Sequence, residues 1–182
     1  NLIVTYHPDT IDNTKCIKNL TIILDSLRKI KKTLIIITAP NADAKGVTMI
    51  SFIKGYIKKN KLKNFLYFNS FGSTIYLSLL KIVNGVVGNS SSGISEVPFF
   101  KIGTVNIGNR QQGRYMPISV VNCSNTKASI ENSIRKILSK SFRKKIRKKI
   151  SMKKNERVAK KIVKKLLFFD FRKYNKKIFY DM

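Results

Sequence analysis

Short apolar runs alternate with segments of helical periodicity along most of this chain. Six runs are rich in β-branched and aromatic side chains and are bounded by polar residues or glycine: residues 2–6, 33–38, 65–68, 85–88, 104–107 and 119–122. Runs that are apolar on both faces are typical of strands buried in a parallel sheet. Between them, apolar residues recur at spacings of three and four over residues 17–27, 50–57 and 75–83, which predicts amphipathic helices. The alternation predicts a doubly wound α/β fold with a parallel sheet.

The last third of the chain has a different character. From Ser129 to about Phe169 the sequence is predicted to be helical and basic, and residues 170–182 are predicted to form a basic tail. A length of 182 residues with 43% apolar side chains supports one domain with a real core and excludes a wholly disordered chain. We therefore predict a single domain over residues 1–169.

The formal net charge of +28 resembles that of a nucleic-acid-binding protein. Most of the excess lies after residue 126, however, and the whole chain is rich in Lys, Asn and Ile, as an AT-rich coding bias would make it. We interpret the lysines as a solvated helical face, with a functional basic patch as the alternative. Nucleic acid is therefore not an expected partner.

Several protein classes are excluded by what the sequence lacks. No run approaches the roughly 18 uninterrupted apolar residues of a membrane span, and no charged segment precedes an apolar stretch as in a signal peptide. Cys16 and Cys123 are too few for a disulfide scaffold or a four-cysteine zinc site, and two buried thiols in a reducing compartment are expected. These features predict a cytoplasmic protein without a membrane partner. Because the chain starts on a strand-like segment, we expect it to be cut from something longer.

Clusters of polar residues follow directly after five of the predicted strands, at residues 7–9, 41–43, 70–72, 89–93 and 109–114. In an open parallel sheet, ligands bind beyond the carboxyl ends of the strands. Five such clusters on one edge therefore predict a ligand site there.

The segment of residues 88–96 combines a strand end, a turn of small residues and a helix start. Small residues let the backbone approach a ligand closely, and helical N–H groups with serine hydroxyls favour an anion such as phosphate. Helix capping without any ligand is the alternative. Arg110 and Arg114 of the following loop favour the phosphate interpretation, since guanidinium groups suit bidentate phosphate contacts. Glu96 is suited to accept hydrogen bonds from ribose hydroxyls, and Phe71 flanks the same edge, so a nucleotide is the predicted ligand.

His7 is the only histidine of the chain and follows the first predicted strand. One histidine without companion ligands makes no metal site, so we predict none. At a strand end before Pro8, where the backbone is restrained, a functional role is favoured over a structural one. No G-x-G-x-x-G motif follows the first strand and no P-loop lysine motif occurs, which disfavours NAD-type and P-loop chemistry.

Four segments, in this order, resemble the C-terminal half of the UDP-N-acetylglucosamine 2-epimerase family: residues 4–8 (VTYHP), 40–43 (PNAD), 87–96 (VGNSSSGISE) and 106–114 (NIGNRQQGR). The similarity extends from about residue 2 to about residue 165. The non-hydrolysing branch typically has His-Arg-Arg-Glu-Asn where this chain has His7-Pro8-Asp9-Thr10, and Asp-Ser-Gly-Gly at residues 89–92. Both differences indicate the hydrolysing branch, which belongs to sialic-acid pathways.

The resemblance implies a GT-B architecture, in which two Rossmann-like domains enclose a nucleotide sugar and this chain is the C-terminal one. In such enzymes UDP is eliminated from UDP-GlcNAc and water converts the resulting glycal to N-acetylmannosamine, without a metal or nicotinamide cofactor. The carboxylates that transfer protons belong to the missing N-terminal domain, so we expect this chain to be inactive alone. The exact hexosamine is left open, because close relatives process a diacetamido analogue, and a homo-oligomer is also left open.

The resemblance also implies a role for each candidate residue. His7 would contact UDP and assist the chemistry, while the other residues would bind UDP: Asn41 and Phe71 on the uridine side, Ser90, Ser91 and Arg110 on the diphosphate, Glu96 on the ribose, and Arg114 as an anchor of its loop. The chain departs from the family at Gly103, which replaces a usual proline, and at residues 151–156, which replace a Gly/Asn-rich turn. A GT-B glycosyltransferase fragment and a non-enzymatic basic binding module are the alternatives.

Overall fold

The computed structural model describes residues 1–8, 16–41, 44–150 and 158–170. Within these ranges six parallel strands form one sheet in the order β3-β2-β1-β4-β5-β6. The strands are β1 (Leu2–Thr5), β2 (Ile35–Thr38), β3 (Phe65–Phe68), β4 (Gly85–Gly88), β5 (Gly103–Ile107) and β6 (Val120–Cys123). This is the strand order of a Rossmann fold, and it confirms the predicted doubly wound sheet.

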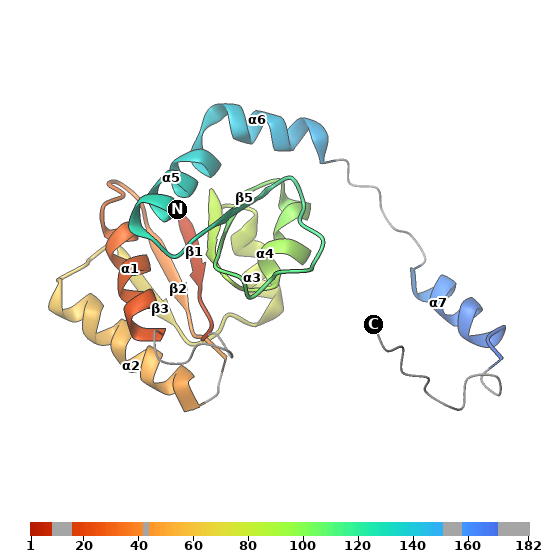
Figure 1. Cartoon of the computed structure of the whole chain (residues 1–182), viewed down its shortest axis with the longest axis horizontal. Coiled ribbons are helices and arrows are strands. Elements are labelled where there is room, and N and C mark those ends of the chain that lie inside the picture. Colours follow the sequence, from red (N-terminus) through yellow and green to blue (C-terminus); the bar gives the residue numbers. More distant parts are fainter. Residues whose placement is uncertain (9–15, 42–43, 151–157, 171–182) are drawn as a thin grey trace, which may run out of the picture. The chain divides into compact units, whose positions relative to one another are not determined.

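Helices cover both faces of the sheet, as Figure 1 shows for the labelled helices α1 and α3. One face packs against α1 (Cys16–Arg28), α2 (Ala44–Lys59) and α5 (Lys127–Leu138). The other packs against α3 (Gly72–Leu80), the short α4 (Ser92–Ser95) and the 3₁₀ helix η2 (Val97–Phe100). Side chains of β1 alternate between the two cores: Leu2 and Val4 lie in the first, and Ile3 lies in the second.

The predicted elements agree with the structure except at their ends. Thr33 and Leu34 precede β2, and the helix predicted to reach Val83 ends at Leu80, although Val83 is still buried in the second core. The predicted basic helical region contains α5, α6 (Lys140–Lys149) and α7 (Val158–Leu167), while residues 151–157 lie outside the described ranges. Ser139 separates α5 from α6, because its extended backbone ends the first helix and its side chain caps the second.

Helix α5 packs closely on the sheet at Gly103, the position where the family usually has proline. A Cβ atom on Gly103 would lie 2.6 Å from Cβ of Ile137, and one on Gly85 would lie 2.7 Å from Cδ1 of the same residue. Gly103 therefore lets α5 approach β5 closely, while at Gly85 the contact is with the movable end of the Ile137 side chain.

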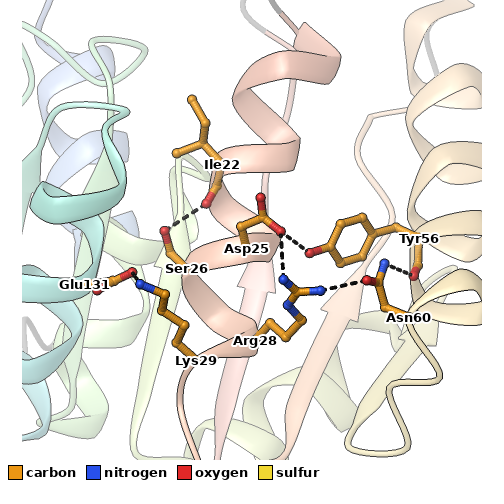
Figure 2. A network of polar contacts seen from close by, with 8 residues as sticks. All are labelled: Ile22, Asp25, Ser26, Arg28, Lys29, Tyr56, Asn60 and Glu131. Atoms are coloured by element: carbon orange, nitrogen blue, oxygen red, sulfur yellow. Dashed lines mark hydrogen bonds and ion pairs between the residues drawn. The ribbon is translucent and has the colours of Figure 1, made fainter.

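Polar contacts join the helices on the first face (Figure 2). The hydroxyl of Tyr56 on α2 donates to Asp25 of α1, and Arg28 donates to Asn60 at 2.7 Å. Burial, followed by this bond to Asp25, raises the pKa of Tyr56 to about 12. Lys29 forms an ion pair of 3.2 Å with Glu131 of α5. The network fixes α1 against both neighbouring helices.

The chain groups into two compact units, Asn1–Ile150 and Ser151–Met182. In the second unit, α7 carries Lys160, Lys161, Lys164 and Lys165, and its apolar side chains are exposed. The predicted extension of the domain to residue 169 stays a prediction. None of the helices in the described ranges is both long enough and apolar enough to cross a membrane.

Candidate functional site

A cavity of about 490 Å³ lies at the carboxyl ends of the strands, where the strand order reverses between β1 and β4. Loops after β1, β2, β3, β4 and β5 all contribute to its lining: Thr5, His7, Thr38, Ala39, Asn41, Asn69, Ser70, Phe71, Gly72, Ser73, Tyr76, Ser90, Ser91, Ser92 and Arg110. The five polar clusters of the sequence therefore do meet at one edge. Six of the eight predicted site residues line this cavity: His7, Asn41, Phe71, Ser90, Ser91 and Arg110.

His7 is held on the floor of the cavity by hydrogen bonds to two other loops. Its side chain is buried, and its Nδ1 accepts a 3.1 Å bond from the backbone N–H of Asn41. Its own backbone N–H donates to Oδ1 of Asn89 at 2.7 Å. The imidazole orientation is thus fixed by the loop after β2, and the backbone position by the loop after β4.

Arg110 reaches the cavity from the loop after β5. Its Nη1 donates to the backbone carbonyl of Asn89 at 3.3 Å, and Nε2 of the buried Gln111 donates to the same oxygen at 2.7 Å. A guanidinium carries five N–H donors, so this single bond orients the group while further donors are available to an anion. Arg110 is half-buried, which strengthens its interaction with a negative ligand.

The serine turn shares the cavity lining with Arg110 and continues into α4. The backbone N–H of Gly93 donates to the Ser90 carbonyl at 3.1 Å, and Thr104 Oγ1 donates to the Gly93 carbonyl at 2.8 Å. These bonds hold the turn against β5. Ser90 and Ser91 line the cavity together with a cationic side chain, a set of residues suited to a phosphate group.

The end of the cavity that lies over β2 and β3 is aromatic and amide-rich. Phe71 packs on Phe68 with ring centroids 4.7 Å apart, and Asn41 is exposed beside His7. A planar base could stack against an aromatic ring here while amide groups bond its edge.

Glu96 and Arg114 are exposed and do not line the cavity. Burial raises the pKa of Tyr76, a lining residue, and the 2.6 Å bond to Ser92 opposes this shift. The Glu96 carboxylate lies near enough to raise the same pKa further, as the smallest of the three causes. Arg114 follows a turn in which its backbone N–H donates to Gln111. The ribose role of Glu96 and the anchoring role of Arg114 stay predictions.

Several residues in or beside the cavity have no role predicted from the sequence, among them Thr5, Thr38, Tyr76 and Gln111. Thr5 and Thr38 end neighbouring strands, and their hydroxyls bond each other at 2.6 Å on the cavity floor. Their positions follow from strand parity. Tyr76 lies one helical turn after Gly72, and this i+4 spacing could have identified it. Gln111 has no such signal, because it lies in an irregular loop.

The described residues offer no group of three His, Cys, Asp or Glu side chains that could hold a metal ion. Cys16 and Cys123 do not form a disulfide, and burial raises the pKa of Cys123.

Comparison with known proteins matches almost the whole chain to one family. The family model described as UDP-N-acetylglucosamine 2-epimerase matches residues 1–167. The GDP/UDP-N,N'-diacetylbacillosamine 2-epimerase (hydrolyzing) of Campylobacter jejuni is 41% identical over 120 residues, which are 66% of this chain and 31% of that protein. The polysialic acid biosynthesis protein P7 of Escherichia coli is 34% identical over 133 residues, which are 72% of this chain and 33% of that protein. The chain spans about a third of the length of these two relatives.

Solved structures of 2-epimerases share the fold. The UDP-GlcNAc 2-epimerase of Methanocaldococcus jannaschii aligns with a TM-score of 0.61 at 16% identity, covering 92% of this chain and 45% of that one. A structure of a UDP-GlcNAc 2-epimerase from the same organism, in complex with UDP-GlcNAc and UDP, aligns with a TM-score of 0.57 at 15% identity over 78% of this chain and 39% of that one. These alignments confirm the predicted fold class, a Rossmann-like sheet of the GT-B type.

Proposed function

This chain belongs to the UDP-N-acetylglucosamine 2-epimerase family, and from that membership we propose that it is the UDP-binding part of a hydrolysing 2-epimerase of the cytoplasm. The complete enzyme would convert UDP-GlcNAc, or a related UDP-sugar, to UDP and N-acetylmannosamine or its analogue. The observation that carries the proposal is the cavity at the strand switch point, where His7, Ser90 and Arg110 meet.

Different loops of the cavity would contact different parts of UDP. Ser90, Ser91 and Arg110 would bind the diphosphate, while Asn41 and Phe71 would contact the uridine. Glu96 would accept hydrogen bonds from the ribose at the edge of the cavity. The UDP-bound state of a family member supports this ligand class, since the M. jannaschii structure is described in complex with UDP-GlcNAc and UDP.

The hydrolysing branch is proposed on two grounds. The serine turn at residues 89–93 and the residues after His7 differ from the non-hydrolysing pattern. The C. jejuni relative, at 41% identity, is described as hydrolyzing. The name of that relative also makes a diacetamido sugar a candidate for the sugar part of the substrate. We further propose that the enzyme acts in a sialic-acid pathway or a related amino-sugar pathway.

We predict that the chain binds UDP in preference to CMP and inorganic phosphate, because base and diphosphate contacts act together. Isothermal calorimetry with the three ligands measures this preference. We expect weak binding of UDP, since a GT-B cleft takes contacts from two domains. Equal binding of all three ligands, or binding of none, would contradict the nucleotide assignment.

Removal of the Arg110 side chain should weaken UDP binding by about 1.5–3 kcal/mol, the range for a hydrogen bond to a charged group. Ser90→Ala should cost about 1 kcal/mol, because the backbone of the turn remains. Arg114→Ala is the matched control, as it removes the same charge from a side chain outside the cavity lining. Unchanged affinity in Arg110→Ala together with lost affinity in Arg114→Ala would show that the two arginines have exchanged roles.

A further inference from the structure

Asn89 directly follows β4, and its side-chain amide forms two hydrogen bonds with the backbone of His7. Its Oδ1 accepts from the His7 N–H at 2.7 Å, and its Nδ2 donates to the His7 carbonyl at 2.9 Å. The side chain is 1% exposed, so water does not compete for these bonds. The amide pairs with the His7 backbone as a neighbouring strand would, and it extends the β1–β4 pairing one step beyond the sheet.

The backbone of Asn89 also bonds the loop that carries Arg110 and Gln111. Its carbonyl accepts from Gln111 Nε2 at 2.7 Å and from Arg110 Nη1 at 3.3 Å. Its N–H donates to the Thr5 carbonyl at 3.2 Å, which ties the residue to the end of β1. Gln111 is also 1% exposed, so its hydrogen bond to the carbonyl that Arg110 contacts is buried as well. One residue thus connects the histidine and the arginine of the site.

The position of His7 determines which of its nitrogens carries the proton. Nδ1 accepts the N–H of Asn41, and a neutral imidazole that accepts at one nitrogen bears its proton on the other. The neutral ring is therefore the Nε2–H tautomer. In that form Nε2 is a hydrogen-bond donor, whereas a general base would need a lone pair on this nitrogen.

We propose that Asn89 is a positioning residue that holds His7, as the Nε2–H tautomer, and Arg110 in one unit, so that both donate to the same anionic group of the ligand. The identity of this group as the UDP diphosphate rests on the proposed function. Asn89 itself acts through His7 and Arg110, since its amide is occupied by the His7 backbone.

Nuclear magnetic resonance of the chain labelled with ¹⁵N-histidine tests the tautomer without any substitution, because His7 is the only histidine. Long-range ¹H–¹⁵N spectra distinguish the two neutral tautomers, and the measurement is made well above the ordinary histidine pKa of about 6.5. We expect one set of signals with the proton on Nε2. A proton on Nδ1, or averaged signals from both tautomers, would overturn the proposal even if every variant failed to fold.

Asn89→Ala then tests the positioning role, with Asn106→Ala as a matched control. Asn106 is 3% exposed and lies on the neighbouring strand, but its amide bonds Asn122 at 2.8 Å instead of His7. In Asn89→Ala we expect averaged imidazole signals and UDP affinity lower by about 10- to 100-fold, the range for losing buried hydrogen bonds. In Asn106→Ala we expect the wild-type tautomer and affinity. Equal effects of both substitutions would reduce Asn89 to a general structural role and refute the proposal.

A double substitution of Asn89 and Arg110 tests whether Asn89 acts through Arg110. If Asn89 acts through Arg110 and His7, Asn89→Ala should lower UDP affinity less in an Arg110→Ala background than in the wild type. Strict additivity would contradict the proposed unit. Failure of the proposed function has a different signature: the wild-type chain would show the Nε2–H tautomer and its loss in Asn89→Ala, yet bind no UDP.

Discussion

Gly88→Ala is expected to prevent stable folding of this chain. Gly88 has φ +141°, a conformation that residues with a Cβ rarely adopt. A Cβ atom there would lie 1.9 Å from the Thr5 carbonyl oxygen and 2.7 Å from its carbon, and both are backbone atoms of the paired strand. Because no side-chain rotation relieves such a clash, β1 and β4 would have to separate where the cavity begins.

The expected loss exceeds about 4 kcal/mol in the free energy of unfolding, which places it among the exceptional single substitutions. Chemical denaturation followed by circular dichroism measures it. Gly55→Ala is the matched control, since it lies in the middle of α2 with nothing within 4 Å of its added Cβ. That substitution should stabilise the chain by about 0.5–1 kcal/mol through helix propensity. A Gly88→Ala chain with wild-type stability would mean that the β4 end has another backbone conformation.

The sheet could be predicted from the sequence because its strands are apolar on both faces. Apolar runs as short as Ile35–Thr38 and Gly85–Gly88 are too short for a typical helix and therefore indicate buried strands. The parallel arrangement of these strands then follows from the helices between them. Parallel strands also bring their carboxyl ends to one edge, so the location of the site followed from the same pattern. Helix ends were less certain, as at Leu80, where the helix ends although the apolar periodicity continues to Val83.

The direction of individual loop side chains could not be predicted in the same way. Glu96 and Arg114 have the right chemistry and the right place in the sequence, but neither lines the cavity. A turn of four or five residues has no fixed period, so chain position does not determine where a side chain points. The role of Asn89 was hidden for the same reason: its contact with His7 joins residues 82 positions apart. Such contacts follow from strand pairing and tight turns together.

The last prediction is that this chain alone does not turn over UDP-GlcNAc, and that adding the N-terminal part of a relative restores turnover. Elimination of UDP needs a base at the sugar C2 proton and a donor to the departing diphosphate, and each such group contributes roughly 10²–10⁴-fold. The described residues that line the cavity include three with ionisable side chains, His7, Tyr76 and Arg110. Arg110 is a cation, and burial raises the pKa of Tyr76, so neither supplies a base near neutral pH.

His7 cannot supply both functions. With Nδ1 accepting the Asn41 N–H, the neutral ring carries its proton on Nε2, and a protonated nitrogen suits donation to the departing diphosphate and not the abstraction of a proton. Among the described lining residues no other side chain offers a base, so we expect the base to come from the part of the relatives that this chain does not span; the chain spans about a third of their length. The test follows free UDP and N-acetylmannosamine from UDP-GlcNAc, with the chain alone, with a relative's N-terminal part alone, and with both. We expect product only from the mixture, and less of it with the Arg110→Ala chain. Robust turnover by the chain alone would require a base within these 182 residues and would contradict the prediction that this chain is inactive alone.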